Sequence, residues 1–189
     1  MGRKAELSTE VIAAAASRLF QSRGFANTSL QDVAEAVGIP KGNFYYHFRT
    51  KDDIVRAVVE HRLGALDAEL AALEKGSRDP GKRLVRFVQA MLTHPDAPFA
   101  LGCPHGSLGL ELAKARPDLL SAARPALERL RAWFAEQFRL AGASAGPDRL
   151  AMHLLARVQG LLLMAATFRD ESFNRRELRE LQKWIASQC

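Results

Sequence analysis

The sequence of 189 residues predicts an all-α fold, and three observations support this. Ala and Leu dominate the apolar residues, while Val and Ile are sparse and no alternating strand pattern occurs. Gly and Pro fall between stretches of helical periodicity. With 48% hydrophobic residues, the chain can bury the cores of a small N-terminal module and a larger helical domain.

Two short helices around a tight turn are predicted between Thr28 and Phe48. Thr28 and Gln31 have the spacing of a capping box, so the first of these helices should begin at Thr28. Its expected apolar stripe consists of Leu30, Val33, Ala34 and Val37. Gly38 ends this helix because Gly adopts the left-handed C′ conformation without a Cβ penalty. Pro40 has the fixed φ of a first helical turn, so the second helix should follow almost at once.

The second helix is expected to present polar and aromatic side chains outward. Phe44 and Phe48 are spaced i, i+4 and should anchor it to the core. Four aromatic residues could simply form a core, but two adjacent tyrosines between two phenylalanines cannot all face one side of a helix. Lys, Asn and Tyr side chains suit phosphate and base edges, as in a helix-turn-helix DNA reader. The DNA-contacting residues predicted in this segment are Thr28, Ser29, Lys41, Gly42, Asn43, Tyr45, Tyr46 and His47.

The stretch G-I-P-K-G-N-F-Y-Y-H-F-R-T-K-D-D-I resembles the signature of the TetR/AcrR family of one-component transcriptional regulators. The resemblance covers about Ser8 to His61 and includes the step Gly24-Phe25. It implies that the start of the fourth helix touches DNA phosphate through the amide and side chain of Lys51. It also implies that movement of this helix carries ligand occupancy to the reading helices.

Charge alone does not locate the DNA site. The net charge is +6, and residues 1–62 hold nine Lys and Arg against seven Asp and Glu. Arg3 and Lys4 form a basic N-terminus, which is either a DNA-following arm or a solvated terminus. Lys41 and Lys51 flank the reading helix.

About nine helices are expected in a DNA-binding domain of residues 1–50 and a ligand-binding and dimerisation domain of residues 51–189. The first helix should run from Ser8 to about Arg23. Thr50 with Asp53, and Asn174 with Glu177, have the spacing of capping boxes. A linker is expected over residues 75–81, and Pro125 predicts a kink or break. The helices expected beyond residue 50 cover residues 51–73, 81–93, 107–115, 118–140, 148–168 and 174–186.

The helix expected over residues 148–168 is apolar on more than one face, which indicates a partner surface or an ordinary core helix of a monomer. The family resemblance implies a homodimer formed by the last two helices as a four-helix bundle, and hence a palindromic operator. The dimer contacts inferred on this basis are Leu154, Val158, Leu161, Leu162, Leu178, Leu181 and Trp184, with Ile185 beside them. His153, Arg157 and Gln159 interrupt the apolar run, and no signal peptide is recognisable, so we expect a cytoplasmic protein.

Cys103 lies in a Gly- and Pro-rich loop before a predicted helix, and His105 is two residues away. A helix N-terminus and a nearby histidine favour a reactive thiol. The loop resembles the Gly-Cys-Pro step of a family subset in which some members sense electrophiles or oxidants. One alternative is that Cys103 is a small buried residue beside the ligand cavity. Another is a metal site formed with His94 and His105, although the sequence has no further pair of ligands at the spacing usual for a metal site. Cys189 is the last residue, so we expect no structural disulfide.

The effector is expected to be a small apolar or electrophilic molecule. The inferred ligand-binding residues, each of which could also be plain core, are Phe87, Met91, Phe99, Cys103, His105, Trp133, Phe134 and Met152. Phe138 and His153 lie on the same helices. An enzyme using Cys103 as nucleophile and His105 as base is the alternative, but neighbours on a Pro-containing loop rarely attain that geometry, and no orienting residue is identifiable. The sequence therefore predicts a ligand-responsive repressor without cofactor or metal.

Overall fold

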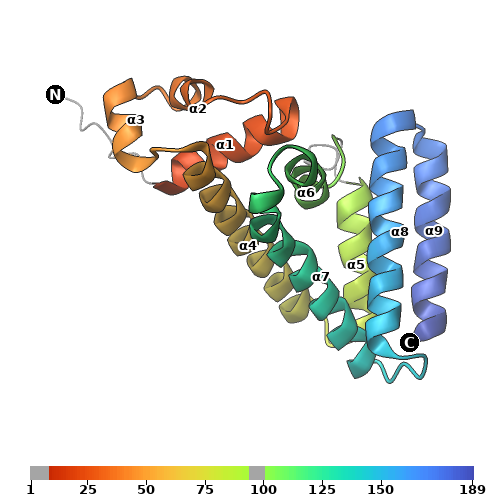
Figure 1. Cartoon of the computed structure of the whole chain (residues 1–189). Coiled ribbons are helices and arrows are strands. Elements are labelled where there is room, and N and C mark those ends of the chain that lie inside the picture. The colour runs from red at the N-terminus through yellow and green to blue at the C-terminus, as the bar shows by residue number, and fades with distance from the viewer. Residues whose placement is uncertain (1–8, 94–100) are drawn as a thin grey trace. The chain divides into compact units, whose positions relative to one another are not determined.

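A computed structural model describes residues 9–93 and 101–189, which fold entirely into helices and connecting turns (Figure 1). The elements are α1 (Thr9–Arg23), α2 (Leu30–Ala36), α3 (Lys41–His47), α4 (Lys51–Gly76), α5 (Pro80–Thr93), α6 (Pro104–Ala115), the 3-10 turn η2 (Pro117–Leu119), α7 (Leu120–Leu140), α8 (Pro147–Phe168) and α9 (Glu171–Gln188). Over these residues the predicted all-α class and the nine α-helices are confirmed.

The chain forms two compact units that do not follow a single cut in the sequence. The first unit combines the residues up to Ala65 with Leu108–Pro125, and the second combines Leu66–Ser107 with Ala126–Cys189. Three helices, α4, α6 and α7, therefore contribute residues to both units. The predicted boundary at residue 50 is not where this division falls.

The core of the first unit joins the N-terminal helices to residues much later in the chain. Ile12 and Phe20 on α1 are buried with Phe44 on α3. Leu108 and Leu112 on α6 belong to the same cluster. Apolar side chains at helical spacing drive this burial, because removing their surface from water stabilises the fold.

Ion pairs and a capping box fix the start of α4. Arg116 donates to both carboxylate oxygens of Asp52, over 2.7 and 2.8 Å, and to Asp118 over 2.6 Å. These hydrogen bonds hold the pKa of Asp52 and of Asp118 below their ordinary values. Thr50 and Asp53 form the predicted capping box, with each backbone N–H bonded to the other's side chain.

Two helix starts differ from those predicted. The N-cap of α2 is Ser29, which forms a capping box with Asp32, so the box of Thr28 and Gln31 was wrong. The N-cap of α9 is Asp170, whose carboxylate accepts from the N–H groups of Ser172 and Phe173. The predicted capping box of Asn174 was therefore also wrong, because α9 begins earlier at Glu171.

The first turn of α7 also differs. The predicted helix from Asp118 begins as the 3-10 turn η2, and α7 then continues through Pro125 without a break.

In the second unit, α5, α8 and α9 lie side by side (Figure 1). Leu154 and Val158 on α8 and Leu181 on α9 are almost completely buried in its core. The C-terminal half of α4 is held to α7 by two polar contacts. Trp133 Nε1 donates to Glu74 Oε1 over 2.8 Å, and Arg129 pairs with Asp67 over 2.6 Å.

Among the described helices, α8 is the one whose length and composition would allow it to cross a membrane. Seven of its residues, including Leu150 and Leu162, are buried against the rest of the second unit. This burial fits the core helix of a soluble protein.

Candidate DNA-binding surface and sensor core

A tight turn joins α2 to α3. Gly38 adopts the left-handed conformation with φ +67°, and the next amide, of Ile39, donates to the Ala34 carbonyl over 3.2 Å. Pro40 supplies the first carbonyl of α3, which accepts from the N–H groups of Asn43 and Phe44. The predicted Gly stop is thus confirmed, and α3 begins directly after Pro40 as expected, although Pro40 is its N-cap with an extended ψ of 141° and does not belong to the first helical turn.

The two faces of α3 separate as expected. Phe44 is 0% exposed and Phe48 is 3% exposed, and their ring centroids lie 5.9 Å apart. Tyr46 is 85% exposed, the highest value among the exposed large hydrophobic residues, and its ring meets His47 edge-on. Gly42, Asn43, Tyr45 and His47 are also exposed. Lys41 begins the helix, but its side chain lies outside the described set.

Thr28 and Ser29 are placed differently from each other. Thr28 is 1% exposed, and its hydroxyl donates to the Gly24 carbonyl over 2.8 Å. The hydroxyl therefore serves the turn before α2, and burial removes this side chain from the surface predicted to contact DNA. Ser29 is exposed, but its side chain is engaged with Asp32 in the capping box.

Lys51 is only half-buried and leans toward the turn between α1 and α2. Its Nζ atom lies 4.2 Å over the ring of Phe25 and donates to the Ala26 carbonyl over 3.4 Å. Burial lowers the pKa of Lys51, and the negative charges of Glu111 and Asp32 oppose that effect. As the first residue of α4, Lys51 also has a backbone N–H without a partner inside the helix, which suits a phosphate oxygen.

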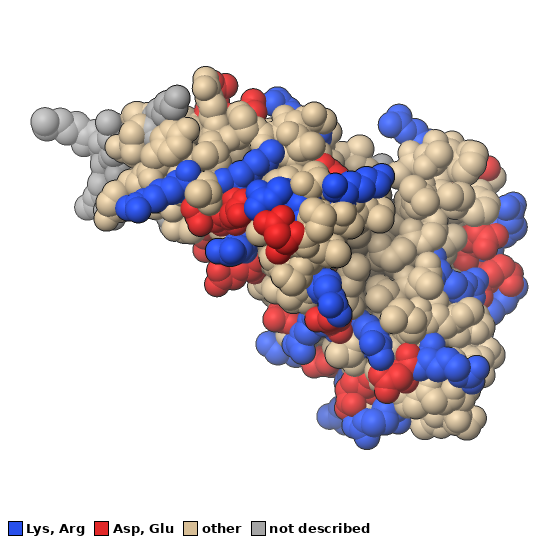
Figure 2. Space-filling model, viewed as in Figure 1, with Lys and Arg blue, Asp and Glu red and all other residues tan. Residues whose placement is uncertain are grey.

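Charge does not mark the reading surface on the face drawn in Figure 2, where Lys and Arg are interspersed with Asp and Glu. Arg49, which follows the C-cap residue Phe48 of α3, is an exposed cation that was not among the predicted DNA contacts. Its position next to the predicted contacts is the signal that could have identified it. Arg3 and Lys4 lie outside the described residues.

Most of the predicted ligand-binding residues meet in the core of the second unit. The ring of Phe87 lies 5.2 Å from that of Phe134 and 5.8 Å from that of Trp133, measured between centroids. Met91 and Cys103 belong to the same buried cluster. These side chains pack against one another, so an effector must displace part of this contact to bind among them.

Three other predicted ligand residues fall elsewhere. Met152 is 50% exposed on α8, so the structure does not bring it into the cluster. The residue was assigned to the inner face of a helix that carries apolar side chains on several faces. His105 is half-buried in the first turn of α6, and Phe99 lies outside the described residues.

Cys103 immediately precedes α6 and is 6% exposed. Its Sγ atom accepts a hydrogen bond from the Gly106 N–H over 3.4 Å. A Cβ on Gly106 would lie 2.7 Å from Oε1 of Gln159, so the glutamine packs directly on the first turn of α6. The Nε2 atom of Gln159 is buried without a hydrogen-bond partner. Cys103 Sγ and Gln159 Oε1 thus both lie against Gly106, at 3.8 and 2.7 Å from the position of a Cβ there, an arrangement that the sequence did not reveal.

No group of three His, Cys, Asp or Glu residues suited to a metal ion occurs in the described part of the chain. His94 of the predicted alternative metal site lies outside that part.

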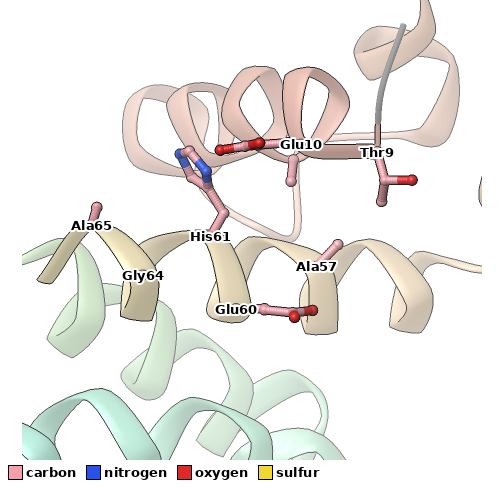
Figure 3. A pocket seen from close by; sticks show the side chains of 8 residues that line it. Thr9, Glu10, Ala57, Glu60, His61, Gly64 and Ala65 are labelled. Atoms are coloured by element: carbon pink, nitrogen blue, oxygen red, sulfur yellow. The ribbon is translucent and has the colours of Figure 1, made fainter. Parts of the chain in front are cut away.

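A pocket of about 550 Å³ opens between α1 and α4 in the first unit (Figure 3). Its space exists because small residues face each other across the two helices, and Glu10 and His61 point toward one another at its rim (Figure 3). The lining residues are Thr9, Glu10, Ala13, Ala57, Glu60, His61, Gly64 and Ala65. None of them was predicted to bind ligand.

The predicted dimer contacts face the chain's own core. Six of the seven are buried within the second unit and Trp184 packs against that core, so these side chains already have partners within the chain. A different stripe of α8 faces outward, formed by Met152, Ala156, Gly160 and Leu163. Met152 is 50% and Leu163 is 60% exposed, and a Cβ on Gly160 would meet open space.

A short helix pair with an outward aromatic and polar face, followed by a larger helical unit, defines a helix-turn-helix DNA-binding protein with a separate sensor part. Residues 12–58 match the model of bacterial regulatory proteins of the TetR family, and residues 80–176 match the LmrA/YxaF-like C-terminal domain of transcriptional regulators. The chain belongs to the TetR family and is a DNA-binding transcriptional regulator.

Individual relatives agree with this assignment. The transcriptional regulator AcuR of Cereibacter sphaeroides is 30% identical over 158 residues, which are 76% of this chain and 69% of AcuR. The transcriptional repressor DhaR of Mycobacterium sp. strain GP1 is 28% identical, over 78% of this chain and 76% of DhaR. The crystal structure of E. coli NemR in its reduced form has the same fold, with a TM-score of 0.82 at 23% identity, over 93% of this chain and 96% of NemR.

Proposed function

We propose that this protein is a cytoplasmic, ligand-responsive repressor that binds a palindromic operator as a homodimer and is released by a small effector. The exposed Tyr46, between the buried anchors Phe44 and Phe48, is the observation that carries the proposal. With Phe44 and Phe48 buried, the side chains of Asn43, Tyr46 and His47 stay available to phosphates and base edges. The relative DhaR is a transcriptional repressor, which supports a repressor role for this chain.

Replacing Tyr46 with Ala should weaken operator binding about 10-fold or more, because one good contact to a base or phosphate contributes about 1–3 kcal/mol. The side chain is 85% exposed, so the helical content should not change. Fluorescence anisotropy with an operator selected from random DNA would measure the affinity, and far-UV circular dichroism would report the fold.

Val11→Ala is the control for Tyr46→Ala, because Val11 is a partly exposed apolar residue of the same unit, on α1. Lys41→Ala should also weaken binding and should reduce the slope of log affinity against log salt by about one, as expected for a lost phosphate contact. Wild-type affinity in both Tyr46→Ala and Lys41→Ala would show that α3 is not the reading helix.

The outward stripe of α8 supports a homodimer. Met152, Ala156, Gly160 and Leu163 recur at helical spacing, and exposed apolar residues grouped in this way mark a protein interface. Small residues at the centre of the stripe permit close approach of a second α8 helix. A two-fold interface of this kind pairs two reading helices and so calls for two DNA half-sites in inverted order.

The effector is proposed to act at Cys103. The thiol lies at the start of α6, and the unpaired Nε2 of Gln159 offers a donor to an oxygen atom of a ligand. The aromatic cluster of Phe87, Trp133 and Phe134 belongs to the same core and suits an apolar body. An electrophile with a carbonyl group next to a carbon–carbon double bond fits this set of groups.

The proposed step is an addition without a leaving group. The Cys103 thiolate forms an S–C bond to the carbon at the far end of the double bond, and the proton lost by the thiol is returned to the carbon next to the carbonyl. The product is a stable thioether that enlarges the side chain in a packed core. Because overpacking a core forces its neighbours to shift, α6 must move. The thiol is modified and not regenerated, so this role requires no catalysis by the protein.

Cys103→Ser should bind operator as the wild type does but should no longer be released by N-ethylmaleimide. The serine hydroxyl is nearly the size of the thiol but is a far weaker nucleophile. The measurement is the operator affinity before and after treatment, with mass spectrometry to count the modified thiols.

Cys189→Ser is the matched control, because Cys189 is the other thiol of the chain and lies at its exposed C-terminus. Partial burial of the thiol group and the charge of Asp79 raise the pKa of Cys189, which slows its reaction. Cys189→Ser should still be released. Normal release of Cys103→Ser would refute thiol sensing at Cys103.

A further inference from the structure

We propose that Glu111 on α6 is a positioning residue for DNA binding, because its carboxylate fixes the turn that leads from α1 into the reading helices. Glu111 itself lies on a helix other than α2 and α3, and it is not proposed to touch DNA. Its role is to hold the backbone of Gly24–Ala26 in the conformation that α2 requires.

The contact between Glu111 and this turn is made to backbone atoms. The Ala26 N–H donates to Glu111 Oε2 over 3.2 Å. Gly24 adopts φ +84°, and a Cβ at Gly24 would lie 2.9 Å from the same oxygen. The turn thus needs glycine both for its left-handed backbone and for the close approach of the carboxylate.

A positive charge contacts the other backbone polar group of the same residue, Ala26. Lys51 Nζ donates to the Ala26 carbonyl over 3.4 Å and lies 4.2 Å over the Phe25 ring. Ala26 therefore has its N–H on an anion and its C=O near a cation. Charge strengthens a hydrogen bond relative to one between neutral groups, and the two contacts act on both backbone polar groups of Ala26, so together they favour one conformation of the turn.

The restrained turn leads directly into α2. The Thr28 hydroxyl bonds back to the Gly24 carbonyl over 2.8 Å, and its N–H donates to the Phe25 carbonyl over 3.3 Å. Ser29, the N-cap of α2, is the next residue. A shift of Gly24–Ala26 would therefore be passed to the start of α2, and through the short turn at Gly38 to α3.

The helix that carries Glu111 is firmly seated. Leu108 and Leu112 on α6 are buried in the core of the first unit, at 4% and 0% exposure. The same helix begins at Pro104, next to Cys103. If the proposed thiol modification moves α6, Glu111 moves with it. This last link rests on the proposed effector role of Cys103, whereas the positioning of the turn does not.

Glu111→Gln is the primary test, because the amide keeps the size and one acceptor oxygen but removes the charge. We expect operator affinity to fall about 10-fold without effector, with an unchanged circular dichroism spectrum. Glu111→Leu removes the acceptor as well and should lower the affinity further. This result has the opposite sign to that of simple electrostatics, since removing a negative charge should strengthen binding to DNA.

Two further measurements separate positioning from other effects. The slope of log affinity against log salt should stay at its wild-type value in Glu111→Gln, because no phosphate contact is lost. In a Lys51→Met background, Glu111→Gln should cost much less than in the wild type, because the two side chains act on the backbone of one residue, Ala26. Glu180→Gln, which makes the same charge change on α9, should leave the affinity unchanged or slightly higher.

An affinity equal to or above that of the wild type in Glu111→Gln would overturn the proposal, as would strictly additive effects of Glu111→Gln and Lys51→Met. Treatment of the wild type with N-ethylmaleimide is measured alongside. If the wild type is not released, the effector role of Cys103 is wrong, but the affinities of the untreated variants still decide the role of Glu111.

Discussion

Replacing Phe44 with Ala should lower the free energy of unfolding by about 3–5 kcal/mol, the usual cost of removing a fully buried phenylalanine side chain. Phe44 is 0% exposed and contacts Phe48 and Tyr45 through ring pairs. The helix that it anchors has only seven residues, too few to persist in water without packing. Because a domain is stabilised by only about 5–15 kcal/mol in total, DNA binding should be lost at 37 °C.

The two tryptophans make it possible to tell which unit unfolds in Phe44→Ala. Trp133 and Trp184 both belong to the second unit, so their fluorescence follows that unit alone. In urea, the ellipticity of Phe44→Ala should begin to fall before its tryptophan fluorescence changes. Phe44→Leu is the control, because it keeps most of the volume and should cost roughly 1 kcal/mol. An unfolding midpoint of Phe44→Ala equal to that of the wild type would mean that Phe44 does not anchor α3.

Leu163→Arg should convert the proposed dimer into a monomer and lower operator affinity about 100-fold. Two linked DNA-binding units bind a double site about 100-fold more tightly than one unit alone, because the second binding event is intramolecular. Leu163 is 60% exposed in the isolated chain, so arginine is tolerated by the fold. At a two-fold interface, however, the change places two buried cations near each other. Light scattering after gel filtration measures the mass, and anisotropy measures the affinity.

Leu110→Arg is the matched control for Leu163→Arg, because Leu110 is 67% exposed but lies on α6 and is not part of the α8 stripe. The Leu110→Arg variant should remain dimeric. Binding to an isolated half-site should be the same for Leu163→Arg and the wild type, whereas binding to the full palindrome should differ. A dimeric Leu163→Arg protein with wild-type affinity would exclude this face as the interface.

The sequence was sufficient for the helices and for the outward face of α3, because both depend on periodicity within a few residues. The first residue of a helix was harder to predict where two neighbouring residues could each act as the N-cap. Thr28 and Ser29 each have a polar partner three residues on, and only the burial of Thr28 against Gly24 decides in favour of Ser29. At α9, Asp170 and Asn174 present the same ambiguity one turn apart.

Contacts between distant segments could not be predicted. Lys51 lies on Phe25, and Glu111 reaches Ala26, across 85 positions of the sequence. Periodicity also fails for α8, because a helix with apolar residues on several faces does not indicate which face turns outward. For this reason Leu154 and Val158 were assigned to the interface, although they fill the chain's own core.

The division of the chain into units has a consequence for its synthesis. The hydrophobic core beneath the reading helices includes Leu108, Leu112, Leu119 and Ala123, which the ribosome adds long after α3. An N-terminal fragment that stops after α4 lacks these four members of the cluster, so the apolar side chains that it contributes itself are less completely buried. The nascent chain therefore cannot complete its DNA reader until Leu108–Pro125 has left the exit tunnel, by which time most of the sensor sequence has been made as well. We therefore expect the two units to complete their folding together, late in synthesis.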